Sequence, residues 1–161
     1  MDKKEIFSKI KNHSIPKWDD LPEIDLYMDQ VIVLMEKYFS NEGSDSKLIT
    51  SSMINNYVKL GIMPAPIKKK YSREHLSYLF IICSLKKVMS ISHIKSMIAE
   101  KLKKNSISEV LNFYSDLYDL SFNTLIEYLS SNKSHIETIE DTAIFSAITA
   151  THCSNISNTL M

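Results

Sequence analysis

The scarcity of glycine is the feature that most constrains how this chain folds. Its 161 residues contain two glycines, Gly43 and Gly61, and four prolines. A β-sandwich or β-barrel needs many tight turns, and those turns depend on these two residue types. Hydrophobic residues make up 44% of the chain, which is enough to bury a core. We therefore predict an all-α fold of long helices with few connections.

Capping residues and apolar spacing locate the helices of the first hundred residues. Residues 26–39 are helical by length and composition and apolar on more than one side, so they should be deeply buried or lie at a subunit interface. Thr50 is a suitable N-cap for the next helix, and Gly61 fits the left-handed residue that ends it. Ser72 and Ser90 can cap two more. The helix after Ser72 should be central to the core, because it carries one apolar stripe: Leu76, Leu79, Phe80 and Cys83.

The last third of the chain predicts a separate helical unit. Two capping boxes, Ser106 with Glu109 and Ser134 with Glu137, open one helix each. A short polar linker joins the two helices, so they should form an antiparallel helical hairpin.

The chain is therefore predicted to have two parts. Residues 1–104 form a helical N-terminal unit with its core at 48–100. Residues 105–161 form the C-terminal helical hairpin, which would serve dimerisation or ligand sensing. Ala143 and Ala147 lie on one face of its second helix and would permit close helix packing.

The net charge of zero conceals three blocks of opposite sign. Residues 1–46 carry six Lys against ten acids, a net of −4. Residues 47–104 carry eleven Lys and one Arg against Glu74 and Glu100, a net of +10. Residues 105–161 carry one Lys against seven acids, a net of −6. The central block is a candidate footprint for a polyanion, and a solvated lysine-rich surface is the alternative.

The helix between Thr50 and Gly61 has two distinct faces. Its apolar residues share one arc at about 100° per residue: Met53, Ile54, Tyr57 and Val58. The opposite arc holds hydroxyls, amides and a lysine: Ser51, Ser52, Asn55, Asn56 and Lys59. Asn is a weak helix former, yet its side chain can pair with adenine in the major groove, while Ser and Lys can bind phosphate. A merely tolerated polar face is the alternative interpretation.

A basic segment follows this helix. Pro64 and Pro66 exclude helix and impose an extended path. Lys68, Lys69 and Lys70 come next, and we expect them in the same extended segment with their side chains pointing in alternating directions. They are candidates for phosphate contacts.

The sequence contains no catalytic or metal-binding motif. Two glycines exclude a Gly-rich phosphate loop, and no HExxH, paired-cysteine or GxSxG pattern is present. We expect no enzyme activity, no cofactor and no metal. Cys83 and Cys153 are interpreted as free thiols, Cys83 as a small buried hydrophobe.

The sequence also predicts where the protein resides. No segment is long and apolar enough to cross a membrane. The first 13 residues, MDKKEIFSKIKNH, read as an amphipathic helix and lack the apolar core of a signal peptide. We therefore expect a cytoplasmic protein.

The order helix, glycine, proline-bearing segment, tyrosine, polar cap and apolar helix resembles the winged-helix DNA-binding domain of MerR-type regulators. "INNYVKLGIMPAP" resembles the end of that family's recognition helix, and "YSREHLSYLFIICSLKKVMSISHIKSMI" resembles its next two helices. Most of residues 14–100 also resembles an uncharacterised bacterial family that shares this module. The resemblance implies binding to double-stranded DNA through Thr50, Ser51, Ser52, Asn55, Asn56, Lys59, Lys68, Lys69, Lys70, Tyr71 and Arg73.

The chain departs from the MerR pattern in several places. Its wing is short, Asn55 occupies a place where the pattern usually has arginine, and the turn at 40–47 is long. A C-terminal hairpin stands where MerR-type proteins usually have one long coiled-coil helix. The resemblance therefore implies DNA binding and does not imply promoter untwisting or metal sensing.

These observations favour a sequence-specific transcriptional regulator that forms a homodimer. A protein-interaction adaptor that reuses the helix-turn-helix scaffold without binding DNA is the alternative, and a small-molecule enzyme ranks third. A small-molecule effector is left open.

Overall fold

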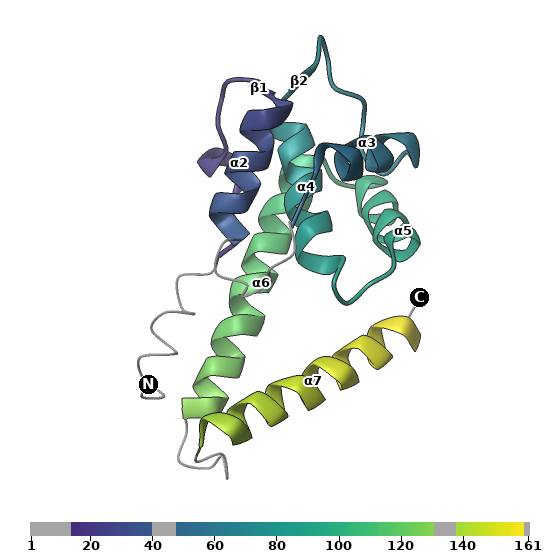
Figure 1. Ribbon diagram of the computed structural model, residues 1–161. Helices are drawn as coiled ribbons and strands as arrows, with labels where there is room; N and C mark the ends of the chain where they lie inside the picture. Colours follow the sequence, from purple (N-terminus) through teal and green to yellow (C-terminus); the bar gives the residue numbers. More distant parts are fainter. Residues whose placement is uncertain (1–13, 40–47, 131–137, 160–161) are drawn as a thin grey trace. The chain divides into compact units, whose positions relative to one another are not determined.

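The computed structural model describes residues 14–39, 48–130 and 138–159 (Figure 1). These residues are mainly helical, which confirms the predicted all-α class apart from one two-stranded sheet. The chain forms two compact units. The larger unit is Ile15–Asp116, and the smaller unit is Met1–Ser14 with Leu117–Met161. The predicted N-terminal helix and the Ser134–Glu137 capping box lie outside the described residues.

The larger unit contains most of the elements. In chain order they are η1 (Trp18–Asp20), β1 (Leu26–Tyr27), α2 (Met28–Phe39), α3 (Ser51–Lys59), β2 (Lys70–Tyr71), α4 (Arg73–Leu85), α5 (Ile91–Leu102) and the start of α6 (Ile107–Ser130). The rest of α6 and α7 (Ile139–Thr159) belong to the smaller unit.

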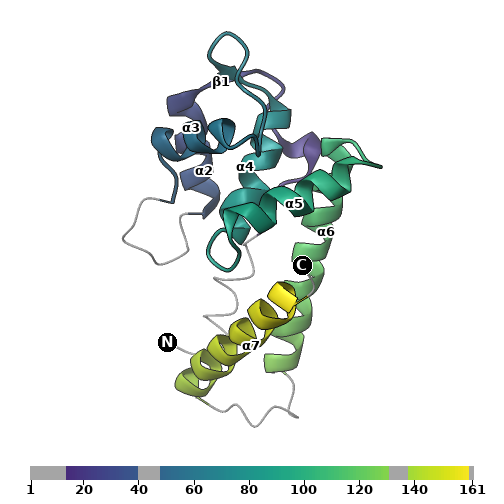
Figure 2. The same cartoon turned by 90° about the vertical axis from the view of Figure 1, so that its right-hand side faces the viewer.

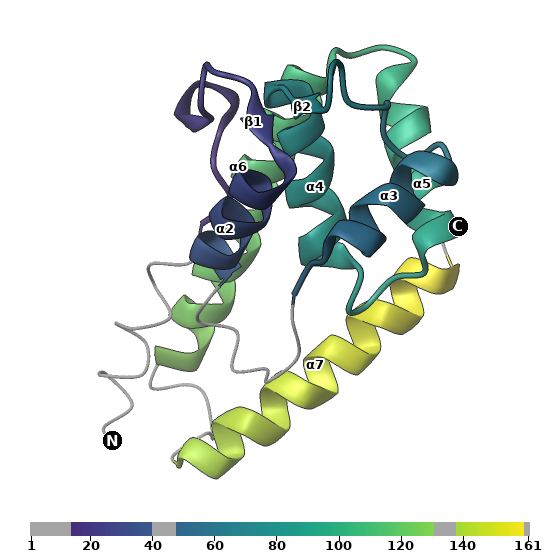
Figure 3. The ribbon, with the colours of Figure 1, turned by 45° about the horizontal axis from the view of Figure 1, so that its top comes forward.

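Helix α4 is the centre of the larger unit's core, as its apolar sequence predicts. Figures 1 and 3 show it between α2 on one side and α3 and α5 on the other. Phe80 is fully buried, and its ring lies 4.9 Å from that of Tyr38 in an edge-on arrangement. The predicted stripe is buried throughout, which confirms it: Leu76, Leu79, Phe80 and Cys83.

Helix α2 begins two residues later than predicted, because the first two residues of the predicted helix form strand β1. Leu26 and Tyr27 are a short strand that pairs antiparallel with β2, with Leu26 opposite Tyr71 and Tyr27 opposite Lys70. The helix then begins at Met28, because the backbone N–H of Tyr27 donates to Oε1 of Gln30 at 2.8 Å and so caps the first turn. The prediction of helix from residue 26 was wrong for these two residues.

The connector before β1, residues 15–25, is hydrogen-bonded to the start of α6. The hydroxyl of Ser115 donates to the carbonyl of Ile15 at 2.7 Å, and the backbone N–H of Trp18 donates to Oδ1 of Asn112 at 2.8 Å. The backbone of Trp18 therefore helps to anchor this connector to the helical body. These contacts explain why the larger unit extends into α6 as far as Asp116.

The predicted capping box at the start of α6 is confirmed. The backbone N–H of Ser106 donates to Glu109 at 2.7 Å, and the backbone N–H of Glu109 donates to Oγ of Ser106 at 3.3 Å. The hydrogen bonds from Ser106 lower the pKa of the Glu109 carboxyl. Helix α7 begins with a box that the sequence reading missed, formed by Thr138 and Asp141.

The smaller unit differs from the predicted close-packed hairpin. Tyr128 of α6 stacks on Phe145 of α7, with ring centroids 5.3 Å apart. Ala143 and Ala147, which were expected to permit close packing, are both exposed. Large aromatic side chains therefore make the contact, and the alanine face of α7 is not covered. No helix among the described residues is long and apolar enough to span a bilayer.

Candidate nucleic-acid interface

The candidate reading face of α3 is exposed as predicted. Ile54 and Tyr57 are buried on the opposite face, and burial raises the pKa of the Tyr57 hydroxyl to about 12. Met53 departs from the expected inward arc, since it is 38% exposed. The exposed arc carries hydroxyl, amide and ammonium groups: Ser51, Ser52, Asn55, Asn56 and Lys59.

Both ends of α3 are capped by its own chain. The hydroxyl of Thr50 accepts from the backbone N–H of Met53 at 3.2 Å, which confirms the predicted N-cap. Gly61 has a φ of 65°, and the N–H groups of Gly61 and Ile62 donate to the carbonyls of Val58 and Tyr57. This pair of hydrogen bonds is a Schellman motif. The motif needs a residue in the left-handed conformation at this position, and glycine adopts it without a steric penalty because it has no Cβ.

Two lysines hold α3 from neighbouring elements. The ammonium of Lys86, at the end of α4, donates to the carbonyl of Leu48 just before α3. The ammonium of Lys95, on α5, donates to the carbonyl of Leu60 at 2.6 Å just after it. These two cations belong to the basic block of residues 47–104, so part of that charge serves to position α3.

The basic segment folds as a tight β-hairpin rather than an extended strand. The backbone groups of Ile67 and Lys70 donate to each other at 3.1 and 2.9 Å, which leaves a two-residue loop (the 67–70 hairpin). Lys68 and Lys69 form that loop, with φ values of 49° and 64°. Their side chains therefore do not alternate along a strand, and the prediction of an extended path was wrong here. Figure 2 shows the hairpin projecting at the top of the view.

Two positive φ values in succession are typical of a type I′ turn, which favours Asn and Gly. Lysine is unusual at both places, because its Cβ is crowded in the left-handed region. The turn therefore exposes two ammonium groups at its tip at some cost in backbone strain.

The remaining cations divide into free and engaged groups. The ammonium of Lys70 lies 5.2 Å from the ring centroid of Tyr27, and that of Lys101 lies 4.2 Å from the ring centroid of Phe113. Within the part of the chain that the structure describes, the ammonium groups of four exposed lysines make no hydrogen bond, ion pair or ring contact: Lys59, Lys68, Lys69 and Lys104. Lys59 lies on α3, and Lys68 and Lys69 lie in the 67–70 hairpin, so these three are the cations best placed for a polyanion.

A buried histidine fixes the base of the 67–70 hairpin. Nδ1 of His75 accepts from the backbone N–H of Ser72 at 3.0 Å, so the ring proton is on Nε2. Nε2 then donates to the carbonyl of Ala65 at 3.1 Å. The segment that leads into the hairpin is thereby tied to the start of α4. Sequence reading gave His75 no role, because its partner lies ten residues away.

Two residues named with the DNA-binding set lie elsewhere in the fold. Tyr71 is 2% exposed, so its ring belongs to the core. The guanidinium of Arg73 donates to the carbonyls of Leu21 and Pro22 at 3.0 and 3.3 Å, and pairs with Glu23 at 3.4 Å. We therefore leave Tyr71 and Arg73 out of the candidate interface.

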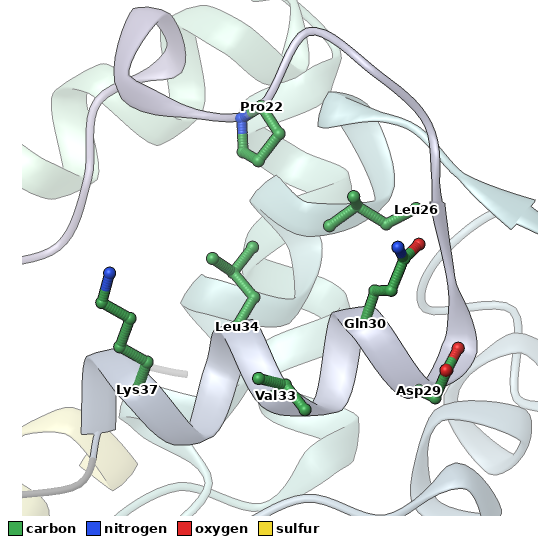
Figure 4. Close-up of a pocket in the computed structure, with 7 residues that line it drawn as sticks. All are labelled: Pro22, Leu26, Asp29, Gln30, Val33, Leu34 and Lys37. Atoms are coloured by element: carbon green, nitrogen blue, oxygen red, sulfur yellow. The ribbon is translucent and has the colours of Figure 1, made fainter.

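A groove of about 350 Å³ lies along one side of α2 (Figure 4). Gln30, Leu34 and Lys37 rise from one side of α2 toward Pro22 in that view. The groove is lined by four apolar residues, Pro22, Leu26, Val33 and Leu34, and by three polar ones, Asp29, Gln30 and Lys37. The described residues contain no group of three or more His, Cys, Asp or Glu that is able to hold a metal ion.

Comparison with protein families places most of the larger unit in a known family. Residues 16–119 match the family described as Domain of unknown function (DUF1836). The chain belongs to this family. The match confirms the predicted uncharacterised family, and the DUF1836 range nearly coincides with the larger unit, Ile15–Asp116. No curated protein and no solved structure matches the chain.

Proposed function

We propose that the DUF1836 domain binds double-stranded DNA through α3 and the 67–70 hairpin, and that the chain is a sequence-specific transcriptional regulator. The observation that carries the proposal is the exposed face of α3, which presents hydroxyls, amides and an ammonium without any carboxylate. Amide side chains suit base edges in the major groove, and hydroxyl and ammonium groups suit phosphates. A reading helix must also be rigidly held, and Lys86 and Lys95 hold both ends of α3.

The order of the elements supports a winged helix-turn-helix of the MerR type. In this proposal α2 and α3 are the helix-turn-helix pair, and the 67–70 hairpin is a short wing whose base joins the β1–β2 sheet. The wing presents Lys68 and Lys69 to the phosphate backbone, where each neutralised phosphate releases a counterion.

Exposed apolar side chains on the smaller unit support a homodimer. Ile144 and Ile148 lie one turn apart on α7 and are 59% and 51% exposed. Contiguous exposed apolar side chains are typical of surfaces that associate. Two copies would place two α3 helices on successive half-sites, which is how dimeric helix-turn-helix proteins recognise DNA.

The proposal is tested by DNA binding at varied salt. We expect the full chain to bind duplex DNA in fluorescence anisotropy at about 50 mM salt, and log affinity to fall linearly with log salt up to about 200 mM. Genome-wide capture of bound DNA should then return a recurring sequence. If captured fragments bind no better than random duplex and neither binding responds to salt, α3 does not read DNA.

The groove on α2 favours the adaptor as the second candidate function. It is a mainly apolar surface on the domain, and Val33 in its lining is 65% exposed. An apolar helix of a partner protein would fit such a surface. Val33→Glu separates the two functions, since it should abolish binding of a protein partner and leave DNA affinity unchanged.

A further inference from the structure

A second cleft, of about 600 Å³, lies between the end of α3, α4 and α5. Its volume is within the range of small-molecule sites. Buried side chains form its apolar lining: Ile62, Met63 and Ile98. The cleft lies wholly within the larger unit and is separate from the exposed face of α3.

The cleft carries one charge of each sign, contributed by different helices. Lys95 of α5 provides an ammonium, and Glu74 in the first turn of α4 provides a carboxylate. No ion pair joins the two among the described residues. The Glu74 carboxylate makes no hydrogen bond within the described part of the chain either, so it is available.

The ammonium of Lys95 can donate further hydrogen bonds. It donates one hydrogen bond, to the carbonyl of Leu60, and an ammonium has three donors. Tyr78 supplies a further donor on the cleft wall. Burial and the nearby charge of Glu74 raise the pKa of the Tyr78 hydroxyl.

These groups select the charge type of a ligand. A ligand that is only an acid would face Glu74, and one that is only an amine would face Lys95, so either would bring like charges together. A ligand with both charges and an apolar side chain satisfies both groups and the apolar lining.

We propose that this cleft binds a free α-amino acid with an apolar side chain, its carboxylate on Lys95, its ammonium on Glu74 and its side chain against Ile62, Met63 and Ile98. The ligand and the end of α3 then share one ammonium, because Lys95 also holds Leu60. Binding in the cleft is independent of the proposed function, whereas its effect on DNA affinity rests on that function.

Calorimetric titration of the full chain without DNA tests the proposal. The probes are leucine, methionine and phenylalanine, together with two analogues that each lack one charge of leucine: 4-methylpentanoate and 3-methylbutylamine. We expect at least one of the three amino acids to bind with one site per chain. Both analogues should bind more weakly than leucine by about tenfold or more, the scale of one charge-assisted hydrogen bond.

Matched variants assign the binding to the cleft. Lys95→Met and Glu74→Gln should each weaken binding by about tenfold or more. Lys101→Met and Glu100→Gln, which lie on α5 outside the cleft, should leave it unchanged. If Lys95→Met unfolds because Leu60 loses its partner, Glu74→Gln decides, since the Glu74 carboxylate makes no hydrogen bond among the described residues.

The proposal is overturned if none of the three amino acids binds, if 4-methylpentanoate binds as tightly as leucine, or if Glu74→Gln binds as the parent does. Each of these results concerns the protein alone. A failure to bind DNA would therefore contradict the proposed function without contradicting ligand binding in the cleft.

Discussion

The Nε2 atom of His75 lies 3.1 Å from the carbonyl oxygen of Ala65, so a buried imidazole links the entry to the 67–70 hairpin with α4. His75→Leu fills the space but leaves the Ala65 carbonyl and the Ser72 N–H without that partner. We expect a loss of about 1–3 kcal/mol in the free energy of unfolding for each group that water does not satisfy. Urea unfolding measures it.

His93→Leu is the matched control for this change. Nδ1 of His93 is a buried nitrogen without a hydrogen-bond partner among the described residues. Replacing it with an apolar group should therefore be neutral or slightly stabilising. Equal losses for the two variants would show that His75 acts through packing alone.

Lys68→Asn with Lys69→Gly should make the protein more stable and its DNA binding weaker. Asn and Gly are the residues a type I′ turn favours, so relief of the two positive φ values should stabilise the fold by roughly 1 kcal/mol or more. Loss of two phosphate contacts should flatten the salt dependence by about 2 units of slope. Thermal melting and anisotropy at several salt concentrations test both effects.

Lys104→Asn removes the same kind of charge from an exposed position beyond α5 and should change neither quantity. A hairpin variant that keeps the parent's salt slope would show that the wing does not touch DNA.

Asn55→Ala and Asn56→Ala should each remove preference at one base pair. A bidentate Asn–adenine contact discriminates by about 1–3 kcal/mol, while the lysines maintain non-specific affinity. Stability should hardly fall, because both side chains are exposed and Ala is the better helix former. Competition binding with single-base substitutions measures the preference, and Asn123→Ala on α6 is the control. Unchanged preference in both variants would favour the adaptor.

Arg73→Lys keeps the charge and should nevertheless destabilise the domain. One guanidinium contacts the carbonyls of Leu21 and Pro22 and the carboxylate of Glu23, and a lysine cannot reproduce that planar set. We expect a loss of about 1–3 kcal/mol in unfolding free energy with an unchanged salt slope for DNA. A lower slope with unchanged stability would return Arg73 to the interface.

Ile144→Asp with Ile148→Asp should convert the proposed homodimer to a monomer. Both side chains lie exposed on α7, so the change costs the monomer little and places two charges in the proposed interface. Sedimentation equilibrium gives the mass. Ile24→Asp, at an exposed position of the larger unit, should leave the dimer intact.

Local chemistry explains which features could be predicted from the sequence. Thr50, Gly61 and Ser106 act on residues within one turn, so their roles follow from neighbouring residues alone. The core of α4 was predictable because its apolar run is long. The exposed arc of α3 followed from helical spacing once its caps were placed.

The features that were missed depend on distant partners. Strand β1 exists only because Tyr71 and Lys70 pair with it. The sequence counted Lys86 and Lys95 among the cations available to a polyanion. Their role in holding α3 could not be predicted, because their carbonyl partners come close to them only in the folded chain. The turn at Lys68 and Lys69 was missed because lysine rarely adopts the positive φ that a type I′ turn requires. Departures from local residue preference are expected at functional sites.

The hydrogen bond from Ser115 to Ile15 spans 100 residues of chain and closes the larger unit from its first residue to nearly its last. During synthesis, Ile15 leaves the ribosome long before Ser115 has been made. Helices α2 to α5 can form and begin to pack in that interval, but the connector before β1 has no partner until α6 emerges. The domain should therefore complete its folding late in translation, and its N-terminal connector should stay sensitive to proteases on the ribosome until then.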